Sequence, residues 1–334
     1  MSPKKQSEKT TKNKFLEDFL SYLEVERNRS ANTIDNYRFY LTRFFDWASE
    51  NKKIKNLAPS EISLMLINQY RIYLNRLLSE DNEPLKKSTQ NYHLIALRSF
   101  LKFLAKRDIK SMAPEKIELA KMPERSVSFL ETPEVERLLQ VPISGADGKP
   151  SVSWRIGDLR DKAILEVLFS AGLRVSELCA LKRSDINFRK YSHGPLEFTV
   201  RGKGKKVRVV FLSEGSAKWL KEYLGKRTDV SPWMFVRMDK AAGSSAKRDE
   251  EPMTTRSVER LVEKYSRLAG IAKKVTPHTL RHTFATDLLT NDADIRSVQA
   301  MLGHSSITTT QVYTHITDKH LRETHAKFHN KNRK

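Results

Sequence analysis

Three short segments in the second half of the chain carry residue types suited to chemistry on a phosphate. The first is 171–178, with the sequence AGLRVSEL. Its glycine is expected to end one helix, which places Arg174 at the turn into the next helix, with Glu177 positioned to orient it. Taken alone, this pair is a weak signal, because an arginine beside a glutamate is usually a surface ion pair of little energetic consequence.

The second segment is 276–282, with the sequence TPHTLRH. Thr276 is suited to cap a helix that starts at Pro277, so His278 and Arg281 should lie one turn apart on the same face. His278 and His282 also have the spacing of a zinc-binding helix. The glutamate of metalloprotease helices is absent and no cluster of cysteines or carboxylates supplies further ligands, so no metal is expected. A histidine without any chemical role remains the plain alternative.

The third segment is 302–315, with the sequence LGHSSITTTQVYTH. Gly303 is expected to end a helix over 295–302 and to place His304 just beyond that end. Tyr313 should then fall on a short helix or turn that leads back toward His304. A single tyrosine in a polar stretch is normally only a surface residue, so this segment too gains meaning from the other two.

Together the three segments contain what phosphoryl transfer requires. The guanidiniums of Arg174 and Arg281 can clamp the non-bridging oxygens of a phosphate and stabilise charge in the transition state. A phenol, with a reference pKa of about 10, needs a base and a cationic setting to act as a nucleophile. His278 or His304 can provide the base, and Lys203 can protonate the departing alkoxide. These cationic side chains take the place of a metal, so no cofactor is expected.

The order of these residues resembles the tyrosine recombinase (phage integrase) family, and its Xer branch in particular. The matching positions are Arg174 in AGLRVSEL, Lys203 in RGKGKK, His278 and Arg281 in PHTLRH, His304 in LGH and Tyr313 in TTTQVYTH. Residues 30–48 resemble the helical core-binding domain of the same branch. The resemblance therefore extends over nearly the whole chain.

The resemblance implies a role for each position. Tyr313 would attack the scissile phosphate and form a 3′-phosphotyrosyl bond with release of a 5′-hydroxyl. The remaining roles would be phosphate holding by Arg174 and Arg281, general acid catalysis by Lys203, acid/base catalysis toward the tyrosine by His278, and a hydrogen bond to the phosphate from His304. It also implies recombination sites on double-stranded DNA, a synaptic tetramer of this chain, and a paralogous recombinase or a DNA translocase as further partners.

The composition points to the same class of substrate. The chain has 61 Lys and Arg against 40 Asp and Glu, a net charge of +21. Such a surplus repels itself unless a polyanion is the partner, and nucleic acid is the first expectation. A ribosome, an anionic membrane surface or simple solubility are the alternatives. No apolar run is long enough for a membrane span, no secretory signal is visible, and the single Cys179 excludes an internal disulfide, so we expect a cytoplasmic, nucleoid-associated protein.

The periodicity of apolar residues predicts a mainly α-helical protein with a small β-hairpin, and the resemblance implies a two-domain recombinase architecture. The expected segments are a basic arm over 1–12, a helical, SAM-like core-binding domain over 13–108, a linker over 109–128, a catalytic domain over 129–316, and a tail helix over 317–334 that docks on a neighbouring subunit. A frayed basic terminus is the alternative for the tail.

Individual elements are also predicted. In the first domain, helices are expected over 30–49 after Ser30, over 59–79, and from Ser88 onward. The last of these lines up Arg98, Lys102 and Lys106, which form either a DNA-binding ridge or a solvated face. In the second domain, helices are expected over 158–171 and 254–268, and strands over 198–201 and 207–212. Lys205 and Lys206, in the turn between these strands, are further candidate DNA contacts.

Two loops, 142–153 and 239–252, are longer than a minimal Xer protein requires. They leave open whether the protein resolves chromosome or plasmid dimers, which would serve chromosome partition, or integrates and excises a mobile element. Two other functions remain as alternatives: a DNA-binding architectural or regulatory protein without catalysis, and a type IB topoisomerase. The complete set of catalytic residue types argues against the first, and the Xer-like first domain and the tail argue against the second.

Overall fold

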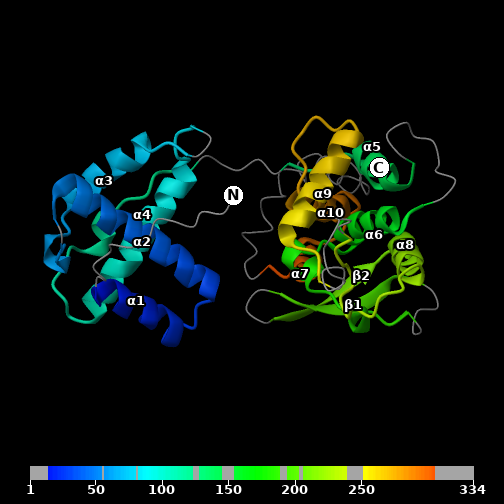
Figure 1. Cartoon of the computed structure of the whole chain (residues 1–334), viewed down its shortest axis with the longest axis horizontal. Coiled ribbons are helices and arrows are strands. Elements are labelled where there is room, and N and C mark those ends of the chain that lie inside the picture. Colours follow the sequence, from blue (N-terminus) through cyan, green and yellow to red (C-terminus); the bar gives the residue numbers. More distant parts are fainter. Residues whose placement is uncertain are drawn as a thin grey trace, which may run out of the picture. The chain divides into compact units, whose positions relative to one another are not determined.

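A computed structural model gives the structure of the chain over residues 14–54, 56–79, 82–122, 128–144, 154–188, 194–202, 206–238 and 251–304. The chain divides into two compact units, unit 1 (Met1–Glu124) and unit 2 (Arg125–Lys334) (Figure 1). Each unit has its own apolar core, and each is described by itself.

The secondary structure of unit 1 is helical in its described part, apart from an isolated β-bridge between Leu78 and Pro84 (Figure 1). Its elements are α1 (Lys14–Val25), α2 (Ala31–Lys52), the 3-10 turn η1 (Pro59–Glu61), α3 (Leu64–Arg76), α4 (Lys87–Lys106) and the 3-10 turn η2 (Pro114–Lys116). Large aromatic side chains from several helices meet in its core, where Phe19 contacts Phe100 and Phe44 contacts Tyr70. Burial of such rings, rather than helix propensity alone, holds the helices together.

One polar pair lies inside this aromatic core. The hydroxyl of Tyr70 and Nδ1 of His93 are 3.0 Å apart, and both side chains are fully buried. Burial, assisted by the positive charge of Arg43, lowers the pKa of His93 to about 4. The imidazole is therefore neutral at physiological pH, which is the form that a dry core tolerates.

The helix starts of unit 1 differ in part from the sequence predictions. Ser30 does precede α2, but its hydroxyl bonds the hydroxyl of Thr33 rather than a backbone amide. The prediction of one helix over 59–79 is wrong, because α3 begins only after Ser63, whose hydroxyl accepts a hydrogen bond from the amide of Leu66. The third helix starts at Lys87 rather than after Ser88.

Unit 2 is built around a central helix, α6, which packs against α5, α8 and α10 (Figure 1). Its elements are α5 (Thr132–Ser144), α6 (Ile156–Ala171), α7 (Val175–Cys179), the 3-10 turn η3 (Arg183–Asp185), β1 (Leu196–Arg201), β2 (Val207–Leu212), α8 (Glu214–Gly225), α9 (Thr255–Leu268), α10 (Pro277–Thr290) and α11 (Ile295–Leu302). Apolar residues occur on nearly every side of α6, which is the composition of an interior helix.

The strands β1 and β2 form an antiparallel pair in which Leu196 is opposite Leu212 and Arg201 is opposite Val207. Alternate residues of β1 are buried, so one face of the pair covers the core. The predicted hairpin and the predicted fold class, mainly helical with a small sheet, are confirmed.

The two predicted loops differ from the structure at their ends. Pro142 is buried inside α5, so the prediction of a loop from 142 is wrong, and the helix continues to Ser144 because Val141 and Pro142 pack into the core. Pro252 pairs with Val236 in an isolated β-bridge, so the predicted second loop is too long as well. The remainder of both loops lies outside the described residues, as do the predicted arm and tail. None of the helices within the described ranges combines the length and apolar composition that membrane crossing requires.

Candidate active site

Arg174 is positioned by the connection between α6 and α7. Helix α6 ends at Gly172, whose φ of 56° is left-handed and whose missing side chain makes room for Phe284, since a Cβ there would lie 2.4 Å from the ring. Arg174 precedes the first residue of α7, and its backbone amide donates to Oε2 of Glu177 at 2.9 Å. Its Nη1 donates to Oε1 of the same carboxylate at 2.9 Å. Glu177 therefore orients Arg174 as the sequence predicted.

The Glu177 carboxylate is shared with a second arginine, Arg208 of β2. Nη1 and Nη2 of Arg208 each donate to one oxygen of Glu177, both at 2.8 Å. Burial alone would raise the pKa of Glu177, but the hydrogen bonds from Arg208 and Arg174 outweigh it and hold the pKa at about 2. Glu177 is therefore an anion at any physiological pH.

Arg281 reaches the same region from α10. The cap and proline predicted for this helix are confirmed, since Thr276 accepts a hydrogen bond from the amide of Thr279 and Pro277 is the first helical residue. The Arg281 side chain is buried, and its Nη1 and Nη2 donate to the carbonyls of Gly172 and Leu302 at 2.5 Å and 2.6 Å. His278, one turn earlier on α10, is exposed.

The two arginines meet at the end of α11. Nη2 of Arg174 lies 3.4 Å from the carbonyl oxygen of Gly303, next to the Leu302 carbonyl that Arg281 binds. The contact of Arg174 is long for a hydrogen bond, and its side chain is 26 % exposed. The two guanidiniums thus lie at adjacent carbonyls of one turn.

His304 follows directly after this turn. Gly303 ends α11 with a φ of 64°, as predicted, and His304 is tied to Gln299 by two hydrogen bonds through its own backbone. Burial, together with the charges of Arg281 and Arg174, lowers the pKa of His304 to about 4. Burial also lowers the pKa of His282, to about 4, so both imidazoles are neutral at physiological pH.

The β-hairpin reaches the site through Gly202. A Cβ built on Gly202 would lie 3.1 Å from Oε1 of Glu177 and 3.6 Å from Nη1 of Arg174, so the strand ends beside these two side chains. The amide of Gly202 donates to the carbonyl of Lys206, whose side chain is exposed. Lys203 and Lys205, which follow Gly202 in the turn, lie outside the described residues, and Tyr313 does too.

The described part of the site carries an excess of positive charge. Three guanidiniums, those of Arg174, Arg208 and Arg281, surround a region with a single carboxylate, that of Glu177. Such a region favours an anion, and planar guanidiniums favour the oxygens of a phosphate. The arrangement is therefore suited to holding a phosphate group and to stabilising additional negative charge on it.

Arg208 was missed by the sequence analysis. A signal was present, because β2 alternates and places residue 208 on the same face as the buried Val210 and Leu212. An arginine on the buried face of a strand must find a charged partner.

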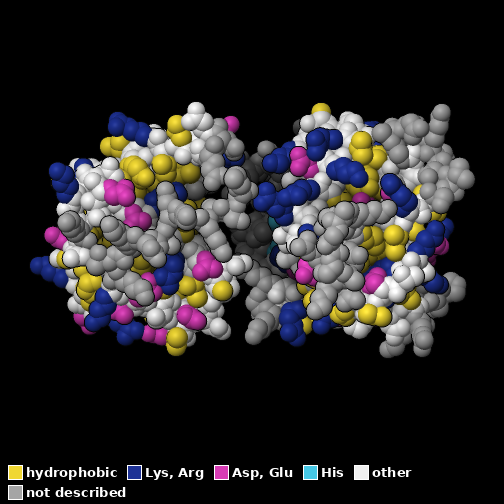
Figure 2. All heavy atoms as spheres, in the orientation of Figure 1, with side chains coloured by type: hydrophobic (Ala, Val, Ile, Leu, Met, Phe, Trp, Pro, Cys, Tyr) yellow, Lys and Arg dark blue, Asp and Glu magenta, His cyan; other side chains and the backbone are white. Residues whose placement is uncertain are grey.

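Candidate DNA contacts occur in both units. In unit 1, Lys102 and Lys106 are exposed and Arg98 is half-buried, while Lys102 also lies 4.0 Å from Glu115. In unit 2, the sequence analysis missed a basic ridge on α9, although the spacing of four, four and three residues was visible. The exposed residues of this ridge, the α9 ridge, are Arg256, Arg260, Lys264 and Arg267. Figure 2 shows dark blue side chains gathered over this helix.

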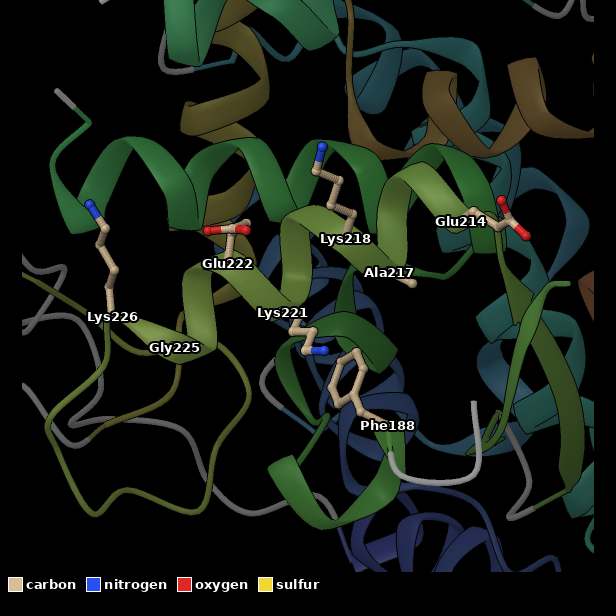
Figure 3. Close-up of a pocket in the computed structure, with 8 residues that line it drawn as sticks. All are labelled: Phe188, Glu214, Ala217, Lys218, Lys221, Glu222, Gly225 and Lys226. Carbon is tan, nitrogen blue, oxygen red and sulfur yellow. The ribbon is translucent and has the colours of Figure 1, made fainter. Parts of the chain in front are cut away.

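Other features of the described chain contribute no alternative chemistry. No group of three or more metal-ligating side chains occurs within the described ranges, and burial raises the pKa of Cys179 to about 11, which is unsuited to a nucleophile. A groove along α8 is lined by Lys218, Lys221 and Glu222, with Lys221 extending toward the ring of Phe188 (Figure 3). It includes none of the residues gathered around Glu177.

The chain matches two models of known families that between them span most of its length. Residues 16–108 match the phage integrase N-terminal SAM-like domain, and residues 128–320 match the phage integrase family. Among known relatives, tyrosine recombinase XerA of Pyrococcus furiosus is 35% identical over 319 residues, covering 95% of this chain and 94% of the relative. Tyrosine recombinase XerC of Thermodesulfovibrio yellowstonii is 32% identical, covering 94% of this chain and 96% of the relative.

Solved structures share the fold at lower identity. The XerH site-specific recombinase in a post-cleavage complex with a palindromic difH substrate has a TM-score of 0.66 and 23% identity, covering 93% of this chain and 84% of that one. A lambda integrase dimer bound to a core site has a TM-score of 0.62 and 18% identity, covering 90% of this chain and 93% of that one. With matched family models over both units and full-length relatives above 30% identity, the chain belongs to the phage integrase family as a Xer-type tyrosine recombinase, a DNA strand transferase.

Proposed function

We propose that this protein cuts and rejoins a specific duplex DNA site through a covalent bond between Tyr313 and a 3′-phosphate. The observation that carries the proposal is the placement of Arg174 and Arg281 at adjacent carbonyls of the turn 302–303. The segment that contains Tyr313 follows this turn in the sequence. A phosphate bound by both arginines would therefore be presented close to where the tyrosine segment begins.

The proposed chemistry exchanges one phosphate ester for another. The phenolic oxygen of Tyr313 forms a bond to phosphorus while the bond from phosphorus to the 5′-oxygen breaks. His278 accepts the phenolic proton and Lys203 donates a proton to the departing 5′-oxygen. Rejoining reverses these steps when a 5′-hydroxyl attacks the phosphotyrosine. Because the covalent bond conserves the energy of the original ester, no nucleotide cofactor is needed.

The electrostatics of the site support this assignment. Arg174 and Arg281 would hold the non-bridging oxygens, and each such contact contributes about 3 kcal/mol to the transition state. A neutral His304 can donate a hydrogen bond to the phosphate without adding a further positive charge to a cluster of arginines. Arrival of the phosphate would offset these charges and raise the pKa of His304.

Binding of the DNA is assigned to basic surfaces on both units. We assign the α9 ridge of unit 2 and the residues Arg98, Lys102 and Lys106 of unit 1 to phosphate contacts along the duplex, together with Lys205 and Lys206 of the hairpin. The assembly is proposed to be a tetramer that joins two sites, with the tail 317–334 docking on a neighbouring subunit. A cytoplasmic, nucleoid-associated location follows from the proposed substrate.

The test is covalent trapping on a nicked suicide duplex, in which the strand fragment with the 5′-hydroxyl diffuses away after cleavage. Wild type and Tyr22→Phe, a matched control in unit 1, are expected to form a covalent adduct on a denaturing gel. Tyr313→Phe is expected to bind the same duplex without an adduct. Binding without an adduct in all three proteins would support a DNA-binding protein without catalysis, and relaxation of supercoils without site preference would support a topoisomerase.

The biological role is read from the trapped DNA. Sequencing the DNA attached to Tyr313 in cells is expected to return one short, recurrent site. A single chromosomal or plasmid location supports dimer resolution and a role in chromosome partition, whereas element ends support integration and excision. Random fragments without a common motif would contradict a site-specific enzyme.

A further inference from the structure

Arg208 links three segments of unit 2 that meet at the proposed active site. Its Nη1 and Nη2 bind both oxygens of Glu177 on α7, and its Nε donates to the carbonyl of Met301 on α11 at 2.9 Å. The side chain is only 10 % exposed and originates on β2. The close fit extends to Gly303, where a Cβ would lie 2.8 Å from Cδ of Arg208.

The two arginines bind Glu177 with different numbers of guanidinium nitrogens. Arg208 binds the carboxylate with two guanidinium nitrogens, whereas Arg174 uses only Nη1 from its guanidinium. Oε2, which a second nitrogen of Arg174 would need for a bidentate pair, already accepts from the Arg174 amide and from Nη2 of Arg208. Nη2 of Arg174 is left with the long contact to Gly303.

From this geometry we propose that Arg208 is a positioning residue for strand cleavage. It occupies and neutralises Glu177, so that Arg174 keeps its positive charge and one edge of its guanidinium for the scissile phosphate. Without Arg208, the buried carboxylate would draw Arg174 into a bidentate pair of zero net charge. The site would lose one net positive charge, together with the guanidinium edge that Arg174 offers to the phosphate, while Arg174 itself remained in the chain.

This inference rests on the proposed function and makes a distinct statement about charge. An alternative route is through the hairpin, since Arg208 and Lys203 belong to the same hairpin and a misplaced hairpin would misplace the general acid. The two routes are separated by substrate chemistry. A methylphosphonate at the scissile position removes one negative charge from the phosphate and so lowers the need for arginine charge. A 5′-bridging phosphorothiolate has a leaving group that needs no proton and so removes the need for the acid.

The experiment compares cleavage of suicide duplexes that carry a phosphodiester, a methylphosphonate or a phosphorothiolate at the scissile position. The variant is Arg208→Gln, and the matched control is Arg183→Gln. Arg183 is likewise one of two arginines on a shared carboxylate, that of Asp229, in another part of unit 2. Arg174→Ala and Lys203→Ala serve as references for the loss of charge and of the acid.

On the phosphodiester, Arg208→Gln is expected to cleave on the order of 100-fold more slowly than wild type, with DNA affinity within a few-fold. Arg183→Gln should remain within about 3-fold, consistent with small effects of substitutions away from a site. The methylphosphonate should narrow the gap between Arg208→Gln and wild type, as for Arg174→Ala. The phosphorothiolate should restore Lys203→Ala but not Arg208→Gln.

A double variant tests whether Glu177 is the group that would otherwise capture Arg174. Removing both charges in Glu177→Gln/Arg208→Gln leaves no carboxylate to capture Arg174, so this protein should cleave at least about 10-fold faster than Arg208→Gln alone, a coupling that a double-mutant cycle measures. Should Arg208→Gln fail to fold, as judged by its melting temperature, Arg208→Lys and the double variant carry the same comparison of substrates.

Several outcomes would overturn the proposal. These are unchanged cleavage in Arg208→Gln, rescue of that variant by the phosphorothiolate, absence of rescue by the methylphosphonate in a folded protein, or a double variant that is slower than the single one. None of them affects the function proposed above, which stands or fails on trapping by wild type.

Discussion

The described part of unit 2 contains two carboxylates, Glu177 and Asp229, that are each bound by two arginines, and the two clusters differ in how those arginines are bound. At Asp229, Arg227 binds both carboxylate oxygens with Nε and Nη2, and its Nη1 donates to the carbonyls of two further residues. Every nitrogen of this fully buried guanidinium is therefore bonded within unit 2. Arg183 adds one nitrogen that is shared between the carboxylate and the backbone of Asp229. Arg183 forms these bonds with Nη2 alone, and its side chain is 34 % exposed.

At Glu177, the corresponding cluster lies beside a third guanidinium, that of Arg281. Arg208 takes the bidentate position, and the partly exposed Arg174 keeps Nη2 at a long distance from the Gly303 carbonyl. Arg281 adds another guanidinium at the neighbouring carbonyl of Leu302. The comparison shows that the number of ion pairs does not distinguish a structural cluster from a site. What distinguishes them is the third guanidinium, because Arg281 lies at the carbonyl next to the one that the partly exposed Arg174 contacts.

The largest effect that tests this contrast is expected for Arg174→Ala and Arg281→Ala. Each should lower the rate of strand cleavage by about 10²- to 10³-fold while leaving DNA binding largely intact, because each removes a contact to charge that develops in the transition state. Arg183→Ala, which alters the Asp229 cluster instead, should cleave at nearly the rate of wild type. Single-turnover trapping measures all three, and normal cleavage by either of the first two would exclude that arginine from the site.

At Asp229 we expect a loss of stability without a loss of cleavage. Asp229→Asn leaves the charge of the buried Arg227 without its counter-ion and should lower the free energy of unfolding by about 3 kcal/mol. The cleavage rate per folded molecule should not change, since Asp229 is bonded to Arg183, Arg227 and Ser231 rather than to the residues around Glu177. Urea unfolding and trapping on the same preparations give both quantities, and a loss of cleavage at unchanged stability would break the distinction between the two clusters.

A histidine in unit 1 extends the contrast to pH. Both His93 and His304 have pKa values lowered to about 4, and in both cases burial is the main cause and arginine charge adds to it, from Arg43 at His93 and from Arg281 and Arg174 at His304. Because the folded pKa of His93 lies below its unfolded value of about 6.5, its contribution is present above pH 6.5 and is lost as the pH falls toward 4.

The expected loss of stability for unit 1 over this range is about 3 kcal/mol. It is measured as the pH dependence of denaturant unfolding of the full chain, followed through the fluorescence of Trp47 with the tryptophans of unit 2 replaced by Phe. In His93→Gln, which does not titrate, this part of the pH dependence should disappear. Identical pH profiles for the two proteins would show that His93 is not the titrating group.

The smallest effect is expected at Arg155, which pairs with Asp158 at the same sequence spacing as Arg174 with Glu177. The Arg155 side chain is 86 % exposed, so Arg155→Gln should change stability little and cleavage not at all. Thermal unfolding measures this change, and a loss of several degrees would show that spacing alone, without burial, gives such a pair its strength.

The sequence predicted those parts of the structure that depend on local chemistry. Thr276 with Pro277 indicated the start of α10, and Gly172 and Gly303 indicated helix ends, because each acts through its own backbone. The loop predicted from Pro142 was wrong. Prolines usually end helices, but burial holds this one inside α5.

Long-range pairings were less accessible from the sequence. The partnership of Arg208 with Glu177 joins a strand to a helix far away in the chain, and no local pattern specifies it. The convergence of Arg174 and Arg281 was inferred from the residue types that phosphoryl transfer requires and from a resemblance, and their shared turn at 302–303 emerges only from the fold.

The central claim, that Arg174 and Arg281 bind one phosphate in front of Tyr313, is tested most directly by a structure of Tyr313→Phe on its uncut DNA site. The account predicts guanidinium nitrogens of both arginines within about 2.7–3.2 Å of non-bridging oxygens on a single phosphate, with the ring of residue 313 facing the same phosphorus. A complex in which either arginine stays on the carbonyls of residues 172, 302 or 303 and contacts no phosphate would contradict it.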